Sequence, residues 1–316
     1  MSRRSSTTAI SRPDLGNAAL TAAIDLSQYV ALRVFPIVPV NVREGVLARP
    51  TVKSWLSREN TRRGIGSAPS SSQHEHEIVN VNLTEYSHEE PIDLARKQQL
   101  VGAYDAEVAA AARVTEIILR DAEITALGQL NTSTFSGSAN TTAVSTAWTN
   151  AASSTPLTDI AGAMNQIRTK GGMRGKSFVL MSDRKARDLY LSAQVAGRLQ
   201  YVEKLGLMPT EAQLAMALSV DEVIIARGMY DNAADGLAIS GTSIWTDTQV
   251  FVGFKRDDAD FVTPQLGRSF VDTSLGNPLD TYTYDEPNGK IRRVQVSMAA
   301  DFKLYDTVCG HLLTGC

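Results

Sequence analysis

Residues Arg43–Ile78, with the sequence REGVLARPTVKSWLSRENTRRGIGSAPSSSQHEHEI, form a long polar segment between two strand patterns. Apolar and other residues alternate before it, over residues 38–42, and after it, over residues 79–84. Period-two alternation is typical of β-strands, so the two runs predict a long hairpin that reaches away from the body. Connections longer than about 15 residues without structure of their own are uncommon inside compact domains. We therefore expect contacts outside the chain to order this loop, as in a protein that assembles.

The loop also has an uneven charge pattern. Six basic residues and two acidic ones lie between Arg43 and Arg63, whereas residues 73–90 contain five acidic residues and no Lys or Arg. Two interpretations stay open: the arms neutralise each other across the hairpin, or the loop pairs with a neighbouring subunit through charges and apolar anchors. The candidate intersubunit residues are Arg43, Arg49, Lys53, Trp55, Leu56, Arg58, Arg62, Arg63, Glu75 and Glu77.

Composition places the chain among ordinary soluble globular proteins, with 43% hydrophobic and 21% charged residues. A length of 316 residues is enough for a substantial core and would normally divide into two subdomains. The net charge of −3 argues against a dedicated nucleic-acid binder. The only cysteines, Cys309 and Cys316, cannot form a disulfide framework. Val30–Val42 is interrupted by Arg and Pro, so we expect no membrane span. No signal peptide is visible, so we expect the protein to be synthesised in a cytosol.

Hydrophobic periodicity predicts a mixed order of helices and strands. The strongest pattern is a helix over residues 103–129, with an apolar stripe and a Glu116–Arg120 pair at i, i+4 spacing. Ser87–Glu90 has the spacing of a capping box ahead of Pro91. Further expected elements are a helix over 158–170, a strand over 177–181, a helix from an Asp183 cap to 199, a helix over 209–218, a strand over 223–226, a strand pair within 243–254 that turns at Thr246-Asp247, and strands on either side of a turn at 286–289.

Three motifs could in principle bind a ligand or catalyse a reaction, but a structural interpretation explains each of them better. Gly171–Ser177 resembles a phosphate-binding loop, but Lys170 replaces its first glycine and the segment follows a helix instead of opening one. His74 and His76 could face one side of a strand as metal ligands, with Glu85 or His88 as a third, yet a solvated strand explains them better. Cys309 and His311 fit a packed strand. We expect no catalytic residue, no cofactor site, no metal site and no enzymatic activity.

The order of elements resembles the major capsid proteins of tailed bacteriophages, whose shared architecture is the Hong Kong 97-type capsid fold. The resemblance covers nearly the whole chain. It is carried by the strand Phe178–Ser182 followed by a helix, by Val220–Gly228 followed by Met229-Tyr230, and by Ile244-Trp245 with the later Pro264–Phe270. No single one of these segments is a signature, and their order carries the resemblance.

The resemblance implies an α+β phage major-capsid fold with four parts. In this fold the hairpin is the extended E-loop and the long helix is the spine of a peripheral domain, beside an α/β axial domain. The implied boundaries are 1–36 for an N-terminal arm, 37–83 for the E-loop with its base strands, 84–135 and 263–300 for the peripheral domain, and 136–262 and 301–316 for the axial domain.

The implied function is that of a major capsid protein, which assembles in the host cytoplasm into hexamers and pentamers of an icosahedral virion shell. The shell would enclose double-stranded DNA without sequence readout, and Arg3, Arg4 and Arg12 of the arm could touch phosphates. Implied partners are the chain itself, a separate scaffolding protein, a portal and a decoration protein. An encapsulin-type nanocompartment shell protein stays open as an alternative, followed by an oligomeric α/β enzyme.

Overall fold

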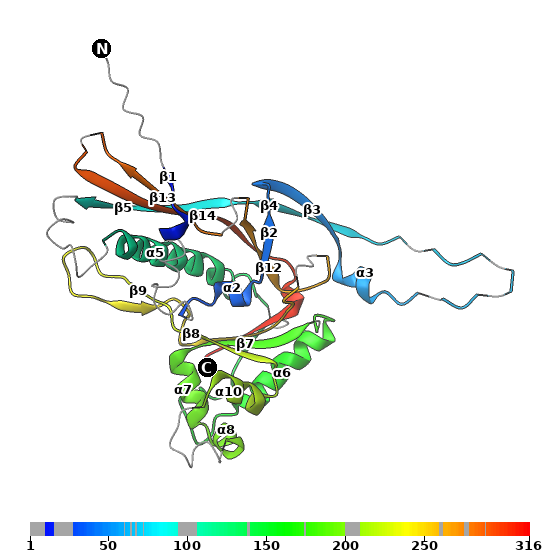
Figure 1. Ribbon diagram of the computed structural model, residues 1–316. Helices are drawn as coiled ribbons and strands as arrows, with labels where there is room; N and C mark the ends of the chain where they lie inside the picture. The colour runs from blue at the N-terminus through cyan, green and yellow to red at the C-terminus, as the bar shows by residue number, and fades with distance from the viewer. Residues whose placement is uncertain are drawn as a thin grey trace.

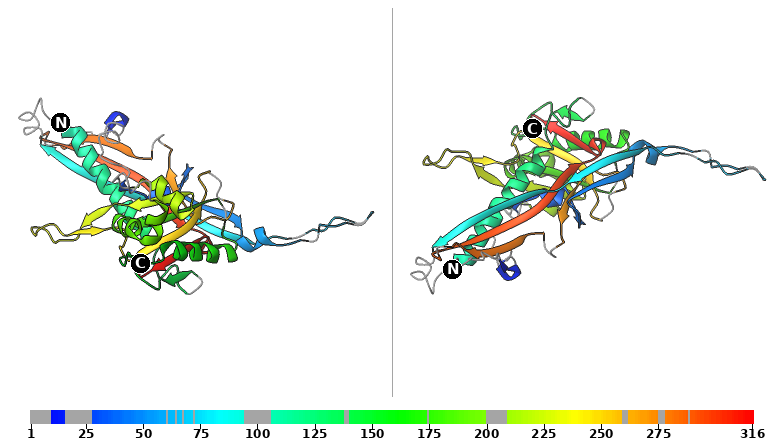
Figure 2. Two further views of the ribbon diagram at one scale, coloured as in Figure 1. Left: turned by 90° about the horizontal axis from the view of Figure 1, so that it is seen from below. Right: turned by 90° about the horizontal axis from the view of Figure 1, so that it is seen from above.

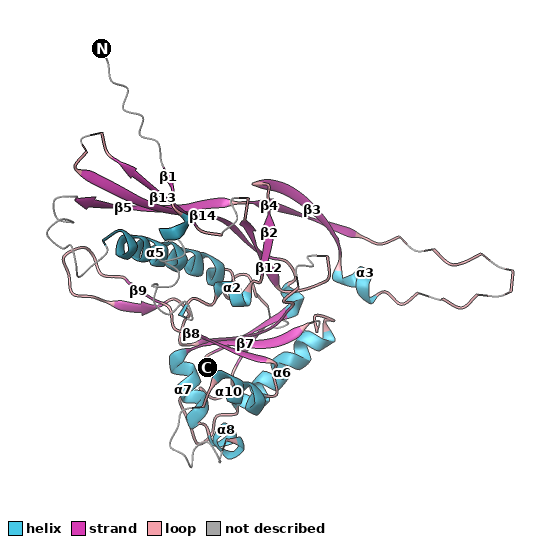
Figure 3. Ribbon diagram, viewed as in Figure 1, coloured by secondary structure: helices cyan, strands magenta, loops and turns pink. Residues whose placement is uncertain are grey.

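Two large sheets, one above the other, form the body of the molecule, and a narrow hairpin leaves it at one side (Figures 1 and 3). The computed structural model describes residues 10–15, 28–59, 61–63, 65–66, 68–71, 73–93, 106–137, 140–173, 175–199, 209–258, 262–274, 278–287 and 289–316.

The first sheet is organised around one long strand, β14 (Ile291–Leu304), which pairs along its length with three others. These are β13 (Asp280–Asp285), β5 (Thr84–Asp93) and β12 (Gly267–Asp272), all antiparallel to β14. Two short strands complete the sheet: β1 (Ile10–Ser11) pairs with β13, and β2 (Ile37–Val40) runs parallel to β12. The expected strands around the 286–289 turn are therefore confirmed as β13 and β14.

The long helix α5 (Ala106–Gly128) lies across this sheet and packs against β5 and β14. Its sequence explains this position, because Ala111, Thr115, Ala122 and Ala126 recur at helical spacing and all are buried. Glu116 Oε1 accepts a hydrogen bond from Arg120 Nη2 at 2.8 Å on the opposite side. The predicted helix, its apolar stripe and its ion pair are confirmed.

The second sheet has β7 (Lys176–Ser182) near its centre, parallel to β8 and antiparallel to β11. Alternate residues of β7 belong to different cores: Phe178 and Leu180 pack toward α5, whereas Val179 and Met181 pack toward the helices below. A strand buried on both faces reads as a continuous apolar run, as this one does. The order of strands is β6 (Thr141–Ala143), β15 (Gly310–Thr314), β11 (Gln249–Lys255), β7 and β8 (Glu222–Ala226).

Among the described residues, four helices cover the face of the second sheet that points away from α5 (Figure 1). The helices expected over 158–170 and 209–218 are present with shifted starts: the first begins at Pro156, and the second begins at Glu211 after a capping box formed by Thr210 and Gln213. Smaller elements are a helix α2 (Ala31–Val34), a helix α3 (Val52–Leu56) and a 3₁₀ turn η2 (Thr307–Cys309). The four covering helices are α6 (Pro156–Thr169), α7 (Asp183–Leu191), α8 (Ala193–Arg198) and α10 (Glu211–Leu218).

The expected helix start at Ser87–Glu90 is wrong, because these residues lie inside the strand β5. All ten residues of β5 pair with β14, from Thr84 opposite Ala300 to Asp93 opposite Ile291. Proline is tolerated in a strand at the edge of a sheet, which is the position of β5, so Pro91 does not end it. The long cross-strand pairing overrides the local capping pattern.

Two further expectations, both for residues that follow β7, need correction. Residues 243–254 do not form a strand pair with each other: β10 (Gly241–Ser243) pairs with β9 (Met229–Asp231), and β11 pairs with β7 and β15. The expected helix over 183–199 is two helices, since Ser192 adopts an extended conformation between them. Its cap is Ser182 and not Asp183, with Ser182 Oγ accepting a hydrogen bond from the Lys185 amide at 3.2 Å.

The strand before the loop also pairs differently from the expectation. The apolar run at 37–40 is β2 and belongs to the first sheet, whereas the hairpin itself consists of β3 (Glu44–Pro50) and β4 (His76–Asn82). The direction of the chain changes at Asn41–Arg43, between β2 and β3. The long strand β14 continues in the first sheet to Leu304, four residues past the boundary expected at residue 300.

Candidate functional site

The projecting loop is the most unusual surface of the molecule. Its arms pair in register from Glu44 opposite Asn82 to Pro50 opposite His76. Beyond this ladder the chain forms the one-turn helix α3, and no strand occurs among the described residues from Ser57 to Glu75. Figure 2 shows the loop leaving an elongated body at the end opposite the β13–β14 turn. The described side chains of its outer part are exposed.

Arg49 fixes the root of the loop to the body. Its side chain is 1% exposed, and it donates from Nη1 to Asp306 Oδ2 at 2.6 Å and from Nη2 to Asp306 Oδ1 at 2.8 Å. Nη2 also donates to Glu77 Oε2 at 2.9 Å, and the guanidinium lies 4.8 Å from the ring centroid of Tyr305. A bidentate pair of this kind sets both position and direction. Arg49 therefore serves within its own chain, not on the surface predicted for it.

Burial around this root has a second electrostatic effect. The Tyr305 phenol packs in the same place, and its desolvation raises the pKa of Tyr305 well above the ordinary value, although the nearby Arg49 opposes the shift. The phenol therefore stays neutral at physiological pH.

The helix α3 lies beside the end of α6. The Thr51 hydroxyl accepts a hydrogen bond from the Ser54 amide at 3.3 Å and starts the helix. Leu56 packs onto Gly171, which has φ of +78° just after α6; a Cβ at Gly171 would lie 2.0 Å from Leu56 Cδ1. Beside this contact lies an open groove of about 670 Å³, lined by Thr51, Val52, Lys53, Leu56, Ser57, Glu77, Lys170, Tyr305, Asp306, Thr307 and Val308.

The remaining predicted residues of the loop are exposed, Leu56 despite its contact with Gly171. Trp55 is 42% exposed and Leu56 is 50% exposed, large fractions for apolar side chains. Among the described residues, Lys53, Arg58 and Arg63 form no ion pair, and all three are exposed. Arg62 and Glu75 are exposed as well. The residues of this outer group are therefore all exposed.

The two interpretations of the charge pattern apply to different parts of the loop. At its root the arms neutralise each other, since Arg49 faces Glu77 in the ladder and Arg43 Nη1 lies 3.1 Å from Glu85 Oε2. Farther out, Lys53, Arg58 and Arg63 form no ion pair with an acidic residue of the described chain. Sequence reasoning could count these charges, but it could not separate root from tip.

The arm residues proposed to touch DNA are only partly described. Arg3 and Arg4 lie outside the described residues. Arg12 follows β1, and its Nε and Nη2 atoms donate to the Asp14 carboxylate at 2.9 and 2.7 Å. Its Nη1 lies 3.9 Å from Glu107 Oε2 on α5. Arg12 is thus already paired with two carboxylates of its own chain.

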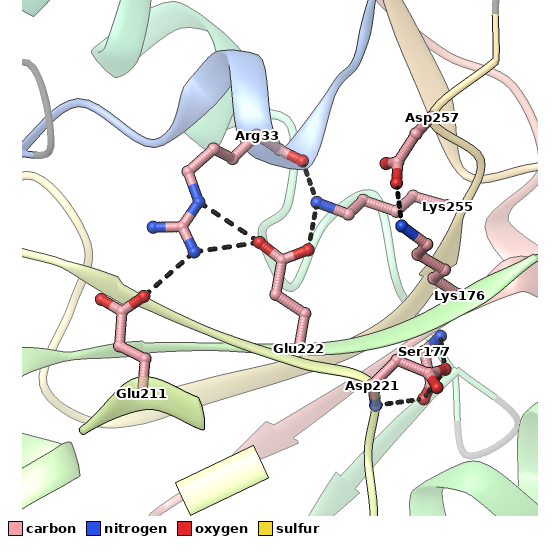
Figure 4. A network of polar contacts seen from close by, with 8 residues as sticks. All are labelled: Arg33, Lys176, Ser177, Glu211, Asp221, Glu222, Lys255 and Asp257. Atoms are coloured by element: carbon pink, nitrogen blue, oxygen red, sulfur yellow. Dashed lines mark hydrogen bonds and ion pairs between the residues drawn. The ribbon is translucent and has the colours of Figure 1, made fainter. Parts of the chain in front are cut away.

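A partly buried polar network joins the segment before β2 to the second sheet (Figure 4). Arg33 Nη2 lies 3.0 Å from Glu211 Oε2 and 2.9 Å from Glu222 Oε1. Lys255, which is 3% exposed, donates to the Arg33 carbonyl at 2.5 Å and lies 2.7 Å from Glu222 Oε2. Sequence reasoning did not identify this network, because its four residues are up to 222 positions apart and carry no local pattern.

The motifs with possible chemistry take structural roles in the described chain. The described residues of the segment 171–177 lead from the end of α6 into β7, whose first residues are Lys176 and Ser177, so the segment precedes a strand where a phosphate loop would precede a helix. His74 and His76 are exposed, and His311 is buried with Nε2 2.9 Å from Thr142 Oγ1. No group of three or more potential metal ligands occurs among the described residues. Nor does any helix in the described ranges have the length and apolarity needed to cross a membrane.

Comparison with known proteins gives a clear answer at the level of fold. No protein-family model and no curated protein matches the sequence. Among solved structures, a phage-related protein from Bordetella bronchiseptica RB50 superposes with a TM-score of 0.69 at 17% identity, covering 98% of both chains. The chain has the fold of a phage major capsid protein.

Two further solved structures with this fold are a phage capsid and an encapsulin. The capsid of Myoviridae phage XM1 gives a TM-score of 0.55 at 12% identity, covering 91% of this chain and 92% of that one. An encapsulin complex from Synechococcus elongatus PCC 7942 gives 0.50 at 10% identity, covering 93% and 89%. Since the identities are low, the likeness concerns the fold, and the expected α+β architecture is confirmed.

Proposed function

We propose that this chain is the major capsid protein of a tailed bacteriophage, a non-enzymatic subunit that self-assembles into hexamers and pentamers of an icosahedral shell around double-stranded DNA. The observation that carries the proposal is the loop: a root held by Arg49 and Asp306 presents an outer part whose described charged and apolar side chains are exposed far from the body. In a monomer, this exposed part of the loop would add little to the stability of the fold. A neighbouring subunit would provide the surface that its exposed side chains bind.

The proposed intersubunit residues are the outer ones: Lys53, Trp55, Leu56, Arg58, Arg62, Arg63 and Glu75. Arg43, Arg49 and Glu77 instead hold the loop to its own chain. Trp55 and Leu56 would act as the apolar anchors of the contact, because buried aromatic and aliphatic groups dominate the binding energy of many interfaces. The arginines around them would set its direction.

The same proposal includes partners that the resemblance to phage capsid proteins implies and that await tests. They are a separate scaffolding protein, a portal, a decoration protein and packaged DNA, with Arg3 and Arg4 of the arm as candidate phosphate contacts. Since Arg12 is already paired with Asp14, we expect it to contribute less to DNA binding than Arg3 and Arg4 do.

The test is to replace residues 57–72 by a short Gly-Ser turn. The ladder β3–β4 and the Arg49–Asp306 pair stay in place, so we expect the variant to keep its circular dichroism spectrum and unfolding midpoint. Electron microscopy of negatively stained material should show closed shells for the wild type and none for the variant. Normal shells from the variant, or a wild type that stays monomeric at every salt concentration, would contradict the proposal.

An encapsulin-type shell is the second candidate, favoured by the likeness to the Synechococcus elongatus structure. The content of purified particles separates the two. Nuclease-protected double-stranded DNA supports the capsid proposal, whereas a co-purifying protein in a particle without nucleic acid supports the encapsulin.

A further inference from the structure

A buried carboxyl group in the middle of α5 holds the segment that runs between the two sheets. Glu123 is 1% exposed. Its Oε1 accepts a hydrogen bond from the Val30 amide at 3.0 Å, and its Oε2 accepts one from the Ala31 amide at 2.6 Å. These amides belong to the start of α2, where backbone N–H groups have no partner within the helix. The glutamate side chain therefore caps a helix from another part of the chain.

The surroundings of this carboxyl group are apolar. It lies at the wall of a cavity of about 320 Å³, whose other lining residues are Tyr29, Ala31, Leu32, Arg33, Leu119, Ala122, Pro278, Leu279, Met298 and Phe302. The lining side chains of β14 (Met298 and Phe302) and of residues 278–279 carry no charge. A carboxylate in such a place has lost its hydration without gaining a counter-ion.

The charged and titratable groups around the site are engaged elsewhere. On α5 itself, Glu116 and Arg120 pair with each other. From the segment before α2, the Tyr29 hydroxyl donates to Glu116 Oε1 at 3.4 Å. From α2, Arg33 pairs with Glu211 and Glu222 on the side of the second sheet (Figure 4). Within the described part of the chain, no cation pairs with Glu123.

The segment Tyr29–Phe35 is thus held from two sides. Glu123 holds its first residues on α5, and Lys255 and the Ser269 hydroxyl hold its last ones by donating to the carbonyls of Arg33 and Phe35 at 2.5 and 2.8 Å. We propose that the Glu123 carboxyl is a pH-sensitive clasp, which holds this segment against α5 more firmly in acid than above neutral pH.

The direction follows from the balance of burial against hydrogen bonding. Desolvation is the largest effect and raises the pKa of Glu123 from 4.5 to about 7, although the two amides oppose the shift. In an opened segment the carboxyl meets water, and its pKa returns toward the ordinary value. The closed form therefore binds the proton more tightly than the open form does. Acid favours closure, and opening becomes easier as the pH rises from about 5 through 7.

The experiment is hydrogen–deuterium exchange of peptides that cover residues 28–36, read by mass spectrometry between pH 5 and pH 8.5. Each rate is divided by the intrinsic rate at that pH to give a protection factor. We expect the wild type to lose protection by about tenfold or more over this range. Glu123→Gln, which is uncharged at every pH and keeps one acceptor oxygen, should show no such loss.

The matched control is Glu116→Gln, seven residues earlier on the same helix and partly exposed. It should retain the wild-type pH dependence. An equal loss of protection in Glu123→Gln, or no loss in the wild type, would overturn the proposal. A carbon-13 titration of glutamate carboxyls in the wild type needs no variant. One carboxyl that titrates near pH 7 supports the clasp, and its absence counts against it. These tests use the single chain, so their outcome is separate from that of the shell proposal.

Discussion

Arg49 illustrates what one side chain decides in this molecule. The ladder of β3 and β4 is a two-stranded ribbon, and isolated ribbons of this size are marginally stable in water. The buried guanidinium adds a bidentate contact to Asp306, which lies 257 residues away in sequence. It therefore couples the loop to the turn between the two sheets.

We expect Arg49→Met to destabilise the chain by about 3–5 kcal/mol, because Asp306 would be left buried without its counter-ion. The free energy of unfolding from urea titration at pH 7 measures this. Lys53→Met is the control on the same loop, where an exposed change should stay within about 0.5 kcal/mol. Similar effects from both substitutions would show that the pair does not anchor the loop.

Gly171 sets where α3 can rest. We expect Gly171→Ala to destabilise the chain by about 1–3 kcal/mol, since its φ is +78° and a Cβ would collide with Leu56. Gly162→Ala in α6 is the matched control, with open space around the new methyl group, and should stabilise by about 0.5–1 kcal/mol. Thermal unfolding of both variants tests the contrast. A neutral Gly171→Ala would mean that Leu56 moves aside freely.

At the scale of elements, sequence patterns predicted those helices and strands whose own hydrophobic pattern decides their structure. The periodicity of α5 was sufficient to predict its stripe, and the apolar run of β7 predicted a buried strand. Local signals failed where a distant partner decides. Ser87–Glu90 looks like a helix start and becomes a strand because β14 lies beside it, and residues 243–254 separate because β10 and β11 each pair elsewhere.

The candidate site divides in the same way. The exposed character of Trp55, Arg58 and Arg63 could be predicted from a polar segment without a core. The internal role of Arg49 could not be predicted, because its partner Asp306 is 257 residues away and no local sequence pattern indicates the pairing. Glu123 was hidden for a similar reason: a glutamate at an apolar position of a helix gives no sign of which backbone amides it will meet.

At the scale of the whole molecule, the fold joins two cores through shared strands, and the proposed contact would place the charges of the outer loop against a second copy. We expect the double substitution Arg58→Glu and Arg63→Glu to slow shell assembly by about tenfold or more at low salt, because exposed charges act mainly on association rates. Light scattering during assembly gives the rate. The wild-type rate should itself fall at high salt, where such charges are screened.

The corresponding lysine variant, Arg58→Lys with Arg63→Lys, keeps the charge and serves as the control. It should assemble close to the wild-type rate. If the glutamate variant also assembles normally, the basic residues of the loop do not steer the contact, and the apolar anchors Trp55 and Leu56 become the remaining candidates.

The short root of the loop has a mechanical consequence. Contacts at Arg49 and Leu56 form a pivot near the body, and the outer arm beyond it is about 30 Å long if its nine or so residues per side are extended. A rotation of about 10° at such a pivot displaces the end by about 5 Å, by simple leverage over that length. In the proposed shell, small adjustments at these two contacts would bridge large differences in spacing between neighbours on a curved surface.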